Sequence, residues 1–226
     1  DLHTAYRRQR QDVYKRQYIL NQKFESCFHK YDFHNLYKEL LSFCTVDLSA
    51  FYFDIRKDTL YCDPINSEKR KSCVTILNVL LKSLLRWFAP ILSFTTEEIH
   101  QLISKNSKSI HLEKFLTFPD KFKNEQLTER WSQLIKIRDV CNISIEEKRA
   151  NKEIGSSLEA ELKIKLNEKY KDIISKIDLS ELCIVSKTQI NFDEGSDILV
   201  ETKKAPGDKC PVCWKISVEP CERHPQ

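Results

Sequence analysis

Apolar residues recur at three- and four-residue steps along three long stretches of the chain, the spacing of a single buried helix face. This spacing predicts helices over residues 18–48, 68–89 and 124–151. Asp32 falls where the first stretch breaks and is placed to cap a second helix. Pro90 ends or kinks the second stretch, and the spacing of Thr95 and Glu98 predicts a capping box that starts a short helix.

The hydrophobic period changes after Gly155. Residues 159–166 alternate between polar and apolar, which predicts a half-buried strand, and 168–177 return to a helical pattern. Two further strands are predicted over 183–192 and 197–204. Together these elements predict a small α/β unit.

The predicted fold is mainly α. A helical bundle over 18–104 is followed by a connector and a long helix over 105–154 that complete the bundle. A small α/β domain over 155–204 and a cysteine-containing segment over 205–226 come last.

Residues 1–17 stand apart from this pattern. They carry five basic residues against two acidic ones, a net charge of +3. The string DVYKRQ over 12–17 is what the transposon end used in sequencing-library preparation encodes when it is read in frame. We expect a non-native leader here. The alternative is a basic arm that binds RNA.

Composition excludes several classes of protein. Hydrophobic residues make up 41% and charged residues 31%, and no apolar run approaches the length of a membrane span. Three glycines leave no room for a glycine-rich phosphate loop, and the absence of Met predicts that the sequence is a fragment. The net charge is +4, but residues 18–226 hold 32 basic and 31 acidic residues, or +1. Any nucleic-acid contact must therefore come from local patches.

Four residues near the end of the chain have metal-ligand spacing. Cys210 and Cys213 form one C-x2-C pair, and Cys221 and His224 form a C-x2-H pair. Three sulfurs and one imidazole suit a single structural Zn²⁺ in a closed tetrahedral site. The alternative is a tail with loose thiols. The remaining cysteines lie among apolar residues and are expected to be reduced; they are Cys27, Cys44, Cys62, Cys73, Cys141 and Cys183.

The sequence contains no recognisable catalytic centre. HExxH, GxSxG and P-loop motifs are absent. Trp214 follows the first cysteine pair, where it would either cover the metal site or offer a stacking platform to a base.

Several strings resemble bacterial isoleucyl-tRNA synthetases, which are class I enzymes. They are YDFHNLYKELLSFCTVDLSAFYFDIRKDTLYCD (31–63), RWFAPILSFTTEEI (86–99), NKEIGSSLEAEL (151–162) and KCPVCWK (209–215). The resemblance implies that the bundle is the anticodon-binding domain, that 155–204 is a junction domain and that 205–226 is a zinc finger. It also implies catalytic and editing domains upstream, because the HIGH and KMSKS signatures are absent; ATP and Mg²⁺ would bind only there.

The resemblance further implies a cytoplasmic, monomeric enzyme without a membrane segment, and a tRNA(Ile) anticodon stem-loop as the partner of this part. The family's zinc ligands fall on Cys210, Cys213 and Cys221. Its second C-x2-C pair is replaced by Cys221 and His224, so the fourth ligand is His224 or a lost cysteine. Residues expected to contact RNA are Arg56, Lys57, Arg149, Lys152, Trp214 and Lys215. The alternatives are a valyl- or leucyl-type synthetase and a free-standing zinc-stapled module that binds RNA or protein.

Overall fold

The computed structural model describes residues 2–105, 108–119, 125–175, 177–195 and 197–224. It divides into two compact units. We call Tyr6–Arg56 with Pro64–Asn124 the helical unit, and Asp1–Ala5, Lys57–Asp63 and Glu125–Gln226 the α/β unit. Within the described residues, no helix combines the length and the apolar character needed to cross a membrane.

The helical unit follows the predicted helical spacing closely. Asp32 caps α2 by accepting a hydrogen bond from the backbone N–H of Asn35, as predicted. The capping box is wrong, because α5 begins two residues before Thr95 and has Leu92 at its N-cap. The elements of this part of the chain are α1 (Leu2–His29), α2 (Phe33–Ser42), the π-helix η1 (Phe43–Phe53), α3 (Asp54–Cys62), α4 (Glu68–Phe88), α5 (Ser93–Ile103) and the 3₁₀ turn η2 (Ile110–Leu112).

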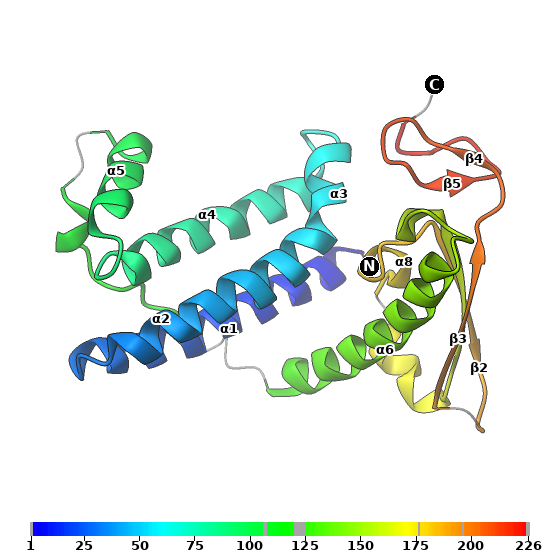
Figure 1. The fold of residues 1–226 in the computed structure, drawn as a ribbon, viewed down its shortest axis with the longest axis horizontal. Helices are drawn as coiled ribbons and strands as arrows, with labels where there is room; N and C mark the ends of the chain where they lie inside the picture. Colours follow the sequence, from blue (N-terminus) through cyan, green and yellow to red (C-terminus); the bar gives the residue numbers. More distant parts are fainter. Residues whose placement is uncertain (1, 106–107, 120–124, 176, 196, 225–226) are drawn as a thin grey trace. The chain divides into compact units, whose positions relative to one another are not determined.

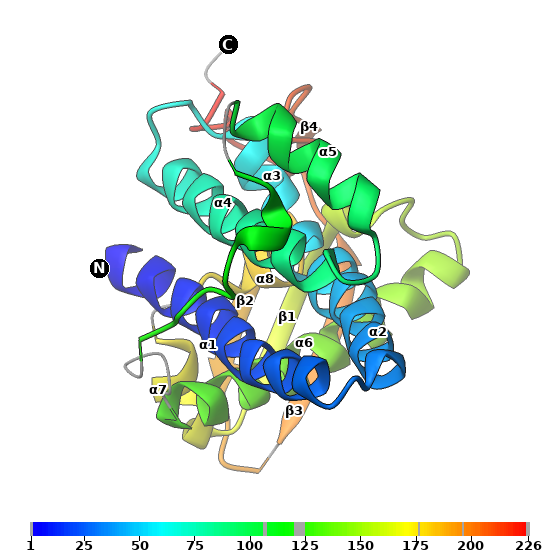
Figure 2. The ribbon, with the colours of Figure 1, turned by 90° about the vertical axis from the view of Figure 1, so that its left-hand side faces the viewer.

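The core of the helical unit is formed by side chains from α1, from the continuous α2–η1 helix and from α4. Figures 1 and 2 show the ribbons of these helices. Trp87 lies at its centre with no exposed surface, and its ring packs edge-on against Phe24 and Phe43. Its indole N–H donates to Asn21 Oδ1 over 2.9 Å, so the one polar atom of the ring is satisfied. The core residues are Leu20, Phe24, Cys27, Leu36, Leu40, Phe43, Leu48, Tyr52, Ile76, Leu80 and Trp87.

The α/β unit is built on a three-stranded sheet in the order β2-β1-β3, with β1 in the middle (Figure 2). β1 pairs in parallel with β2 and antiparallel with β3. The two later strands do not pair with each other, because β1 lies between them. β1 has strand neighbours on both edges, and its burial follows the predicted alternation, since Leu162, Ile164 and Leu166 are buried whereas Lys165 is exposed. The strands are β1 (Ala160–Leu166), β2 (Lys187–Phe192) and β3 (Ile198–Lys204).

Helix α6 (Glu125–Ala150) packs against this sheet (Figure 1). It contacts β3 more extensively than it contacts α7, and the hydroxyls of Ser144 and Thr202 lie 2.7 Å apart. This differs from the expectation that the helix completes the bundle, because its apolar stripe supplies one side of the sheet's core. Short helical segments complete the unit: η4 (Ser157–Glu159), η5 (Glu168–Tyr170), α7 (Lys171–Ile174) and α8 (Leu179–Leu182).

Residues 2–17 lie within α1, so the expected boundary after Gln17 falls inside a helix. Gln17 has no exposed surface, and neither polar atom of its amide finds a hydrogen-bond partner among the described residues. A buried amide without partners costs about 1–3 kcal/mol. Gln17 is therefore poorly suited to its position in the fold.

Candidate metal centre and nucleic-acid interface

The cysteine-containing segment begins with a short hairpin of β4 (Asp208–Lys209) and β5 (Ile216–Ser217). Gly207, just before β4, has a φ of +110°, which L-residues rarely adopt. A Cβ at this glycine would lie 2.2 Å from the carbonyl oxygen of Ser217. Only glycine lets the two backbones approach this closely, and their approach sets the register of the hairpin.

The hairpin holds the first cysteine pair in a tight turn. We call the segment 208–224, which carries all four predicted ligands, the knuckle. The backbone N–H of Cys210 donates to the Lys215 carbonyl over 2.9 Å, and that of Trp214 donates to the Cys210 carbonyl over 3.0 Å. Below the knuckle, the Ser186 hydroxyl accepts from the Ile216 N–H over 2.6 Å and donates to the Leu158 carbonyl. These bonds attach the knuckle to the sheet of the same unit.

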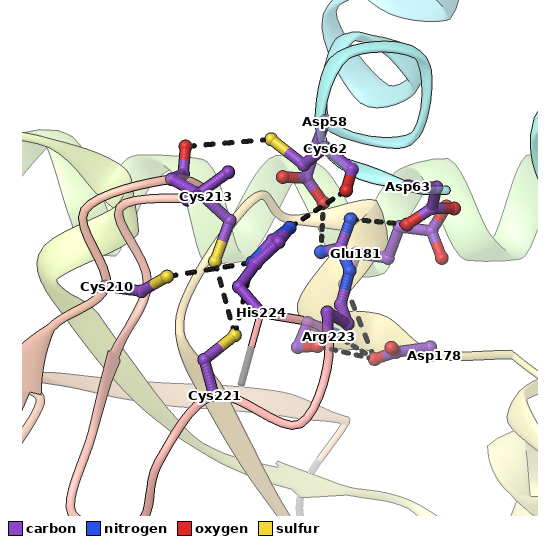
Figure 3. A network of polar contacts seen from close by, with 12 residues as sticks. Asp58, Cys62, Asp63, Asp178, Glu181, Cys210, Cys213, Cys221, Arg223 and His224 are labelled. Atoms are coloured by element: carbon purple, nitrogen blue, oxygen red, sulfur yellow. Dashed lines mark hydrogen bonds and ion pairs between the residues drawn. The ribbon is translucent and has the colours of Figure 1, made fainter. Parts of the chain in front are cut away.

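The structure brings together the four residues predicted as metal ligands (Figure 3). Their ligand atoms all lie within 4.8 Å of one another. His224 Nδ1 is 3.6 Å from Cys210 Sγ and 3.4 Å from Cys221 Sγ, and the sulfurs of Cys213 and Cys221 are 3.8 Å apart. The group can hold a metal ion.

Backbone hydrogen bonds and burial shift the pKa values of the first two cysteines in opposite directions. Backbone N–H groups, that of Cys213 foremost, lower the pKa of Cys210 to about 6. Burial raises the pKa of Cys213 to about 12. The carbonyl of Cys62 raises the pKa of His224 by accepting a hydrogen bond from its ring. Of the first cysteine pair, Cys210 is therefore the thiol that ionises more readily.

The knuckle rests on the last turn of α3, which belongs to the same unit (Figure 3). Arg223 donates to Asp58 over 2.7 Å and to Asp63 over 2.5 Å. His224 Nε2 is 2.8 Å from the Cys62 carbonyl, and the Cys62 thiol is 3.8 Å from the Val212 carbonyl. Nothing in the local sequence predicts these contacts, since about 150 residues or more separate the partners.

The residues predicted to contact RNA differ in how exposed they are. Arg56 is only 4% exposed and makes interactions within the protein, so RNA contact at Arg56 stays a prediction that its burial does not favour. Lys57 is exposed on α3. Arg149 and Lys152 are exposed and line one recess of about 500 Å³ at the end of α6, where Arg149 also pairs with Glu146 at 2.7 Å.

Trp214 is 59% exposed, which does not fit the role of a buried cover for the metal site. Its backbone φ of 63° turns the chain directly after the first cysteine pair. The Lys209 ammonium lies 5.5 Å from the centre of its ring, within cation–π range. Lys215, the next residue along the chain, is half-buried. An exposed ring flanked by lysines can stack on a base near a phosphate.

Comparison with known sequences identifies the family. The family described as the anticodon-binding domain of tRNA ligase matches residues 11–165. The chain belongs to this family. The match covers the helical unit from residue 11 onward and continues through α6 to residue 165 in β1, whereas the four predicted metal ligands lie beyond it.

Relatives of this anticodon-binding family member are isoleucine–tRNA ligases. That of Pelagibacter ubique (strain HTCC1062) is 60% identical over 209 residues, which are 92% of this chain and 23% of the relative. That of Methylacidiphilum infernorum is 40% identical over 88% of the chain and 21% of the relative, and that of Bartonella henselae 36% identical over 88% and 22%. The chain thus spans less than a quarter of these curated relatives.

Proposed function

We propose that this chain is the tRNA-selecting part of an isoleucine–tRNA ligase and binds the anticodon stem-loop of tRNA(Ile). The observation that carries the proposal is the match of its anticodon-binding domain, together with isoleucine–tRNA ligases that are similar along most of the chain. The whole enzyme would charge tRNA(Ile) with isoleucine, using ATP and Mg²⁺ in a catalytic domain outside this sequence. It would act in the cytoplasm as a monomer.

Within this proposal, residues 1–17 are the leader, 18–104 the anticodon-binding bundle, 105–154 the connector and long helix, 155–204 the junction domain and 205–226 the zinc finger, with the long helix packed on the sheet of the junction domain. The buried, unpartnered amide of Gln17 supports the proposal that residues 1–17 are not native. Replacing Gln17 with Leu should raise the stability of the helical unit, because a fully buried apolar side chain leaves no polar atom unpaired. Urea unfolding of the two proteins measures the difference; a lower midpoint for the variant would contradict the explanation.

Zn²⁺ is the proposed occupant of the metal centre, with Cys210, Cys213, Cys221 and His224 as ligands. Bonds of about 2.3 Å to sulfur and about 2.0–2.1 Å to nitrogen place two sulfurs about 3.8 Å apart on a tetrahedron, and a sulfur and a nitrogen about 3.5 Å apart. The distances of 3.8, 3.6 and 3.4 Å fit these values. The ion's chemistry here is structural, because four protein ligands leave no open position.

RNA contact is proposed for Lys57, Arg149, Lys152, Trp214 and Lys215. A Zn²⁺ with three thiolates carries a net charge of −1, so the metal would not attract phosphate. Arg223 is held by two carboxylates, which leaves the lysines near the knuckle to supply positive charge. Stem contacts would be to phosphates, and unstacked anticodon bases would be available for stacking on Trp214.

The test measures binding of a labelled tRNA(Ile) anticodon stem-loop. Lys215→Glu should weaken binding about tenfold, the effect of about 1.4 kcal/mol for a lost charged hydrogen bond. Zinc content should not change. Lys171→Glu is the matched control, since Lys171 is an exposed lysine on α7 of the same unit. Equal affinities of Lys215→Glu and wild type would refute the role of Lys215.

Specificity needs a second measurement. Competition with unlabelled tRNA(Ile), tRNA(Val) and tRNA(Leu) should favour tRNA(Ile); a preference for another tRNA would favour the valyl- or leucyl-type alternative. Equal binding of all three, and of unrelated hairpins, would favour a general RNA-binding module.

A further inference from the structure

The end of α3 and the residue that follows it contact the knuckle through Asp58, Cys62 and Asp63, which we call the α3 seat. The seat precedes the ligand His224 by about 160 residues, and both belong to the α/β unit. Figure 3 shows the side chains of Arg223 and His224 extending toward the seat. The seat contributes none of the four ligand atoms, so its contacts serve another purpose.

The first contact fixes the tautomer of His224. A carbonyl oxygen can only accept a hydrogen bond, so the 2.8 Å contact with the Cys62 carbonyl requires a proton on His224 Nε2. In the neutral ring the lone pair is then on Nδ1, the atom that lies 3.4 and 3.6 Å from two cysteine sulfurs. A metal-ligating histidine needs this arrangement, with its second nitrogen held by an outer acceptor.

The second contact fixes the backbone that carries His224. The Arg223 guanidinium spans the two seat carboxylates, at 2.7 Å from Asp58 and 2.5 Å from Asp63. The side chains of Asp63 and Asp58 are only 10% and 21% exposed, and that of Arg223 is 31% exposed. Partial removal from water strengthens such charge-assisted bonds relative to surface ion pairs.

We propose that the α3 seat positions His224 for the metal, so that metal binding and order in the last turn of α3 are coupled. Asp58, Asp63 and Arg223 are positioning residues, and the Cys62 carbonyl orients the ring. The inference rests on the proposed metal site. Because the coupling is reciprocal, the loaded knuckle must stabilise the seat by the same free energy that the seat adds to metal binding.

Two contacts between the seat and the knuckle also involve the C-terminal end of α3. The Cys62 carbonyl belongs to the C-terminal turn of α3, where carbonyls lack partners within the helix. The His224 ring supplies one such partner, and the Cys62 thiol donates back to the Val212 carbonyl in the knuckle. Loss of the knuckle would leave this helix end without those two bonds, which predicts fraying of the turn.

The test compares metal affinity, measured by Co²⁺ or Zn²⁺ competition against a chelator of known affinity. Asp58→Asn/Asp63→Asn should weaken affinity about 10- to 100-fold, the usual effect of losing outer-shell partners. The matched control, Glu153→Gln/Asp197→Asn, removes two ion pairs from the same unit, those with Lys148 and Lys169, and should leave affinity unchanged. Circular dichroism of each variant checks that the fold persists.

A mutant cycle distinguishes positioning of His224 by the seat from a general effect of the lost charges on metal binding. Arg223→Gln should weaken metal binding as much as the seat double variant, and combining all three substitutions should add little, since both remove the same contacts. Additive losses would overturn the proposal. In the wild type, removing the metal should speed amide exchange across residues 57–63, and unchanged exchange there would also overturn it.

The outcomes distinguish failure of the proposed metal site from failure of the positioning role of the seat. A wild-type chain that takes up neither Co²⁺ nor Zn²⁺ overturns the metal site and the seat together. A wild-type chain that binds metal, with equal affinity in the seat double variant, overturns only the positioning role.

Discussion

Replacing Gly207 with Ala tests whether the hairpin backbone shapes the metal centre. The new Cβ would lie 2.2 Å from the Ser217 oxygen, 2.3 Å from the Ser217 carbonyl carbon and 2.5 Å from the Val218 nitrogen. All three atoms are backbone, so no side chain can move aside to relieve the contact. Alanine would also have to adopt a φ of +110°. Either the hairpin opens or the residue changes its conformation, and both displace Cys210, three residues later.

The backbone conformation alone costs an L-residue about 1–3 kcal/mol. If the knuckle folds around its metal, that cost appears in the metal affinity, because folding and binding are one equilibrium. We therefore expect Gly207→Ala to weaken Zn²⁺ binding by at least about 5- to 150-fold. The steric overlap adds to this range.

The assay is competition with a chromophoric chelator, with Gly195→Ala as the control. Gly195 needs no positive φ, and a Cβ there would meet only Asp193 Oδ1, at 3.8 Å. Gly195→Ala should bind metal as the wild type does. If Gly207→Ala also bound metal within twofold of the wild type, the argument from close backbone approach would be refuted.

Two further predictions concern the helical unit. Trp87→Phe removes the donor to Asn21 Oδ1 inside the core, so it should lower the free energy of unfolding by at least about 1–3 kcal/mol, the cost of an unsatisfied buried group; a urea midpoint equal to that of the wild type would contradict this. Hydrogen bonds from Gln101, Ser109 and the Ile110 N–H lower the pKa of Glu97 below 4.5. The stability that Glu97 contributes should be complete above pH 4.5 and disappear as the pH falls through its lower folded pKa. The amide exchange rate of Ile110 should therefore rise as the pH falls through this pKa. Glu97→Gln is the control, because its Ile110 exchange should not show this additional pH dependence.

Local spacing predicted the features that depend on neighbouring residues. The cap at Asp32, the extent of α6 and the four gathered ligands all follow from patterns within a few turns of chain. Helix α8 (Leu179–Leu182), which Asp178 caps, was not predicted, because its four residues are too few to show a period.

Features that depend on distant partners could not be predicted from spacing. The position of β1 between β2 and β3 is a matter of pairing, and the stripe of α6 fits a sheet as well as a bundle. Arg56 has the charge expected of an RNA contact, yet the fold buries it. No local pattern indicates the role of Asp58, because its partner, Arg223, is 165 positions away.

The 165-residue separation of Asp58 and Arg223 has a consequence for synthesis. Chains emerge from the ribosome at about 5–20 residues per second, so the end of α3 waits about 10–30 s before its partner is made. During that interval two carboxylates and a thiol remain in contact with solvent and open to other partners. Contacts of such long range also slow the final folding step, so the last turn of α3 should be among the latest parts of the α/β unit to reach its native state.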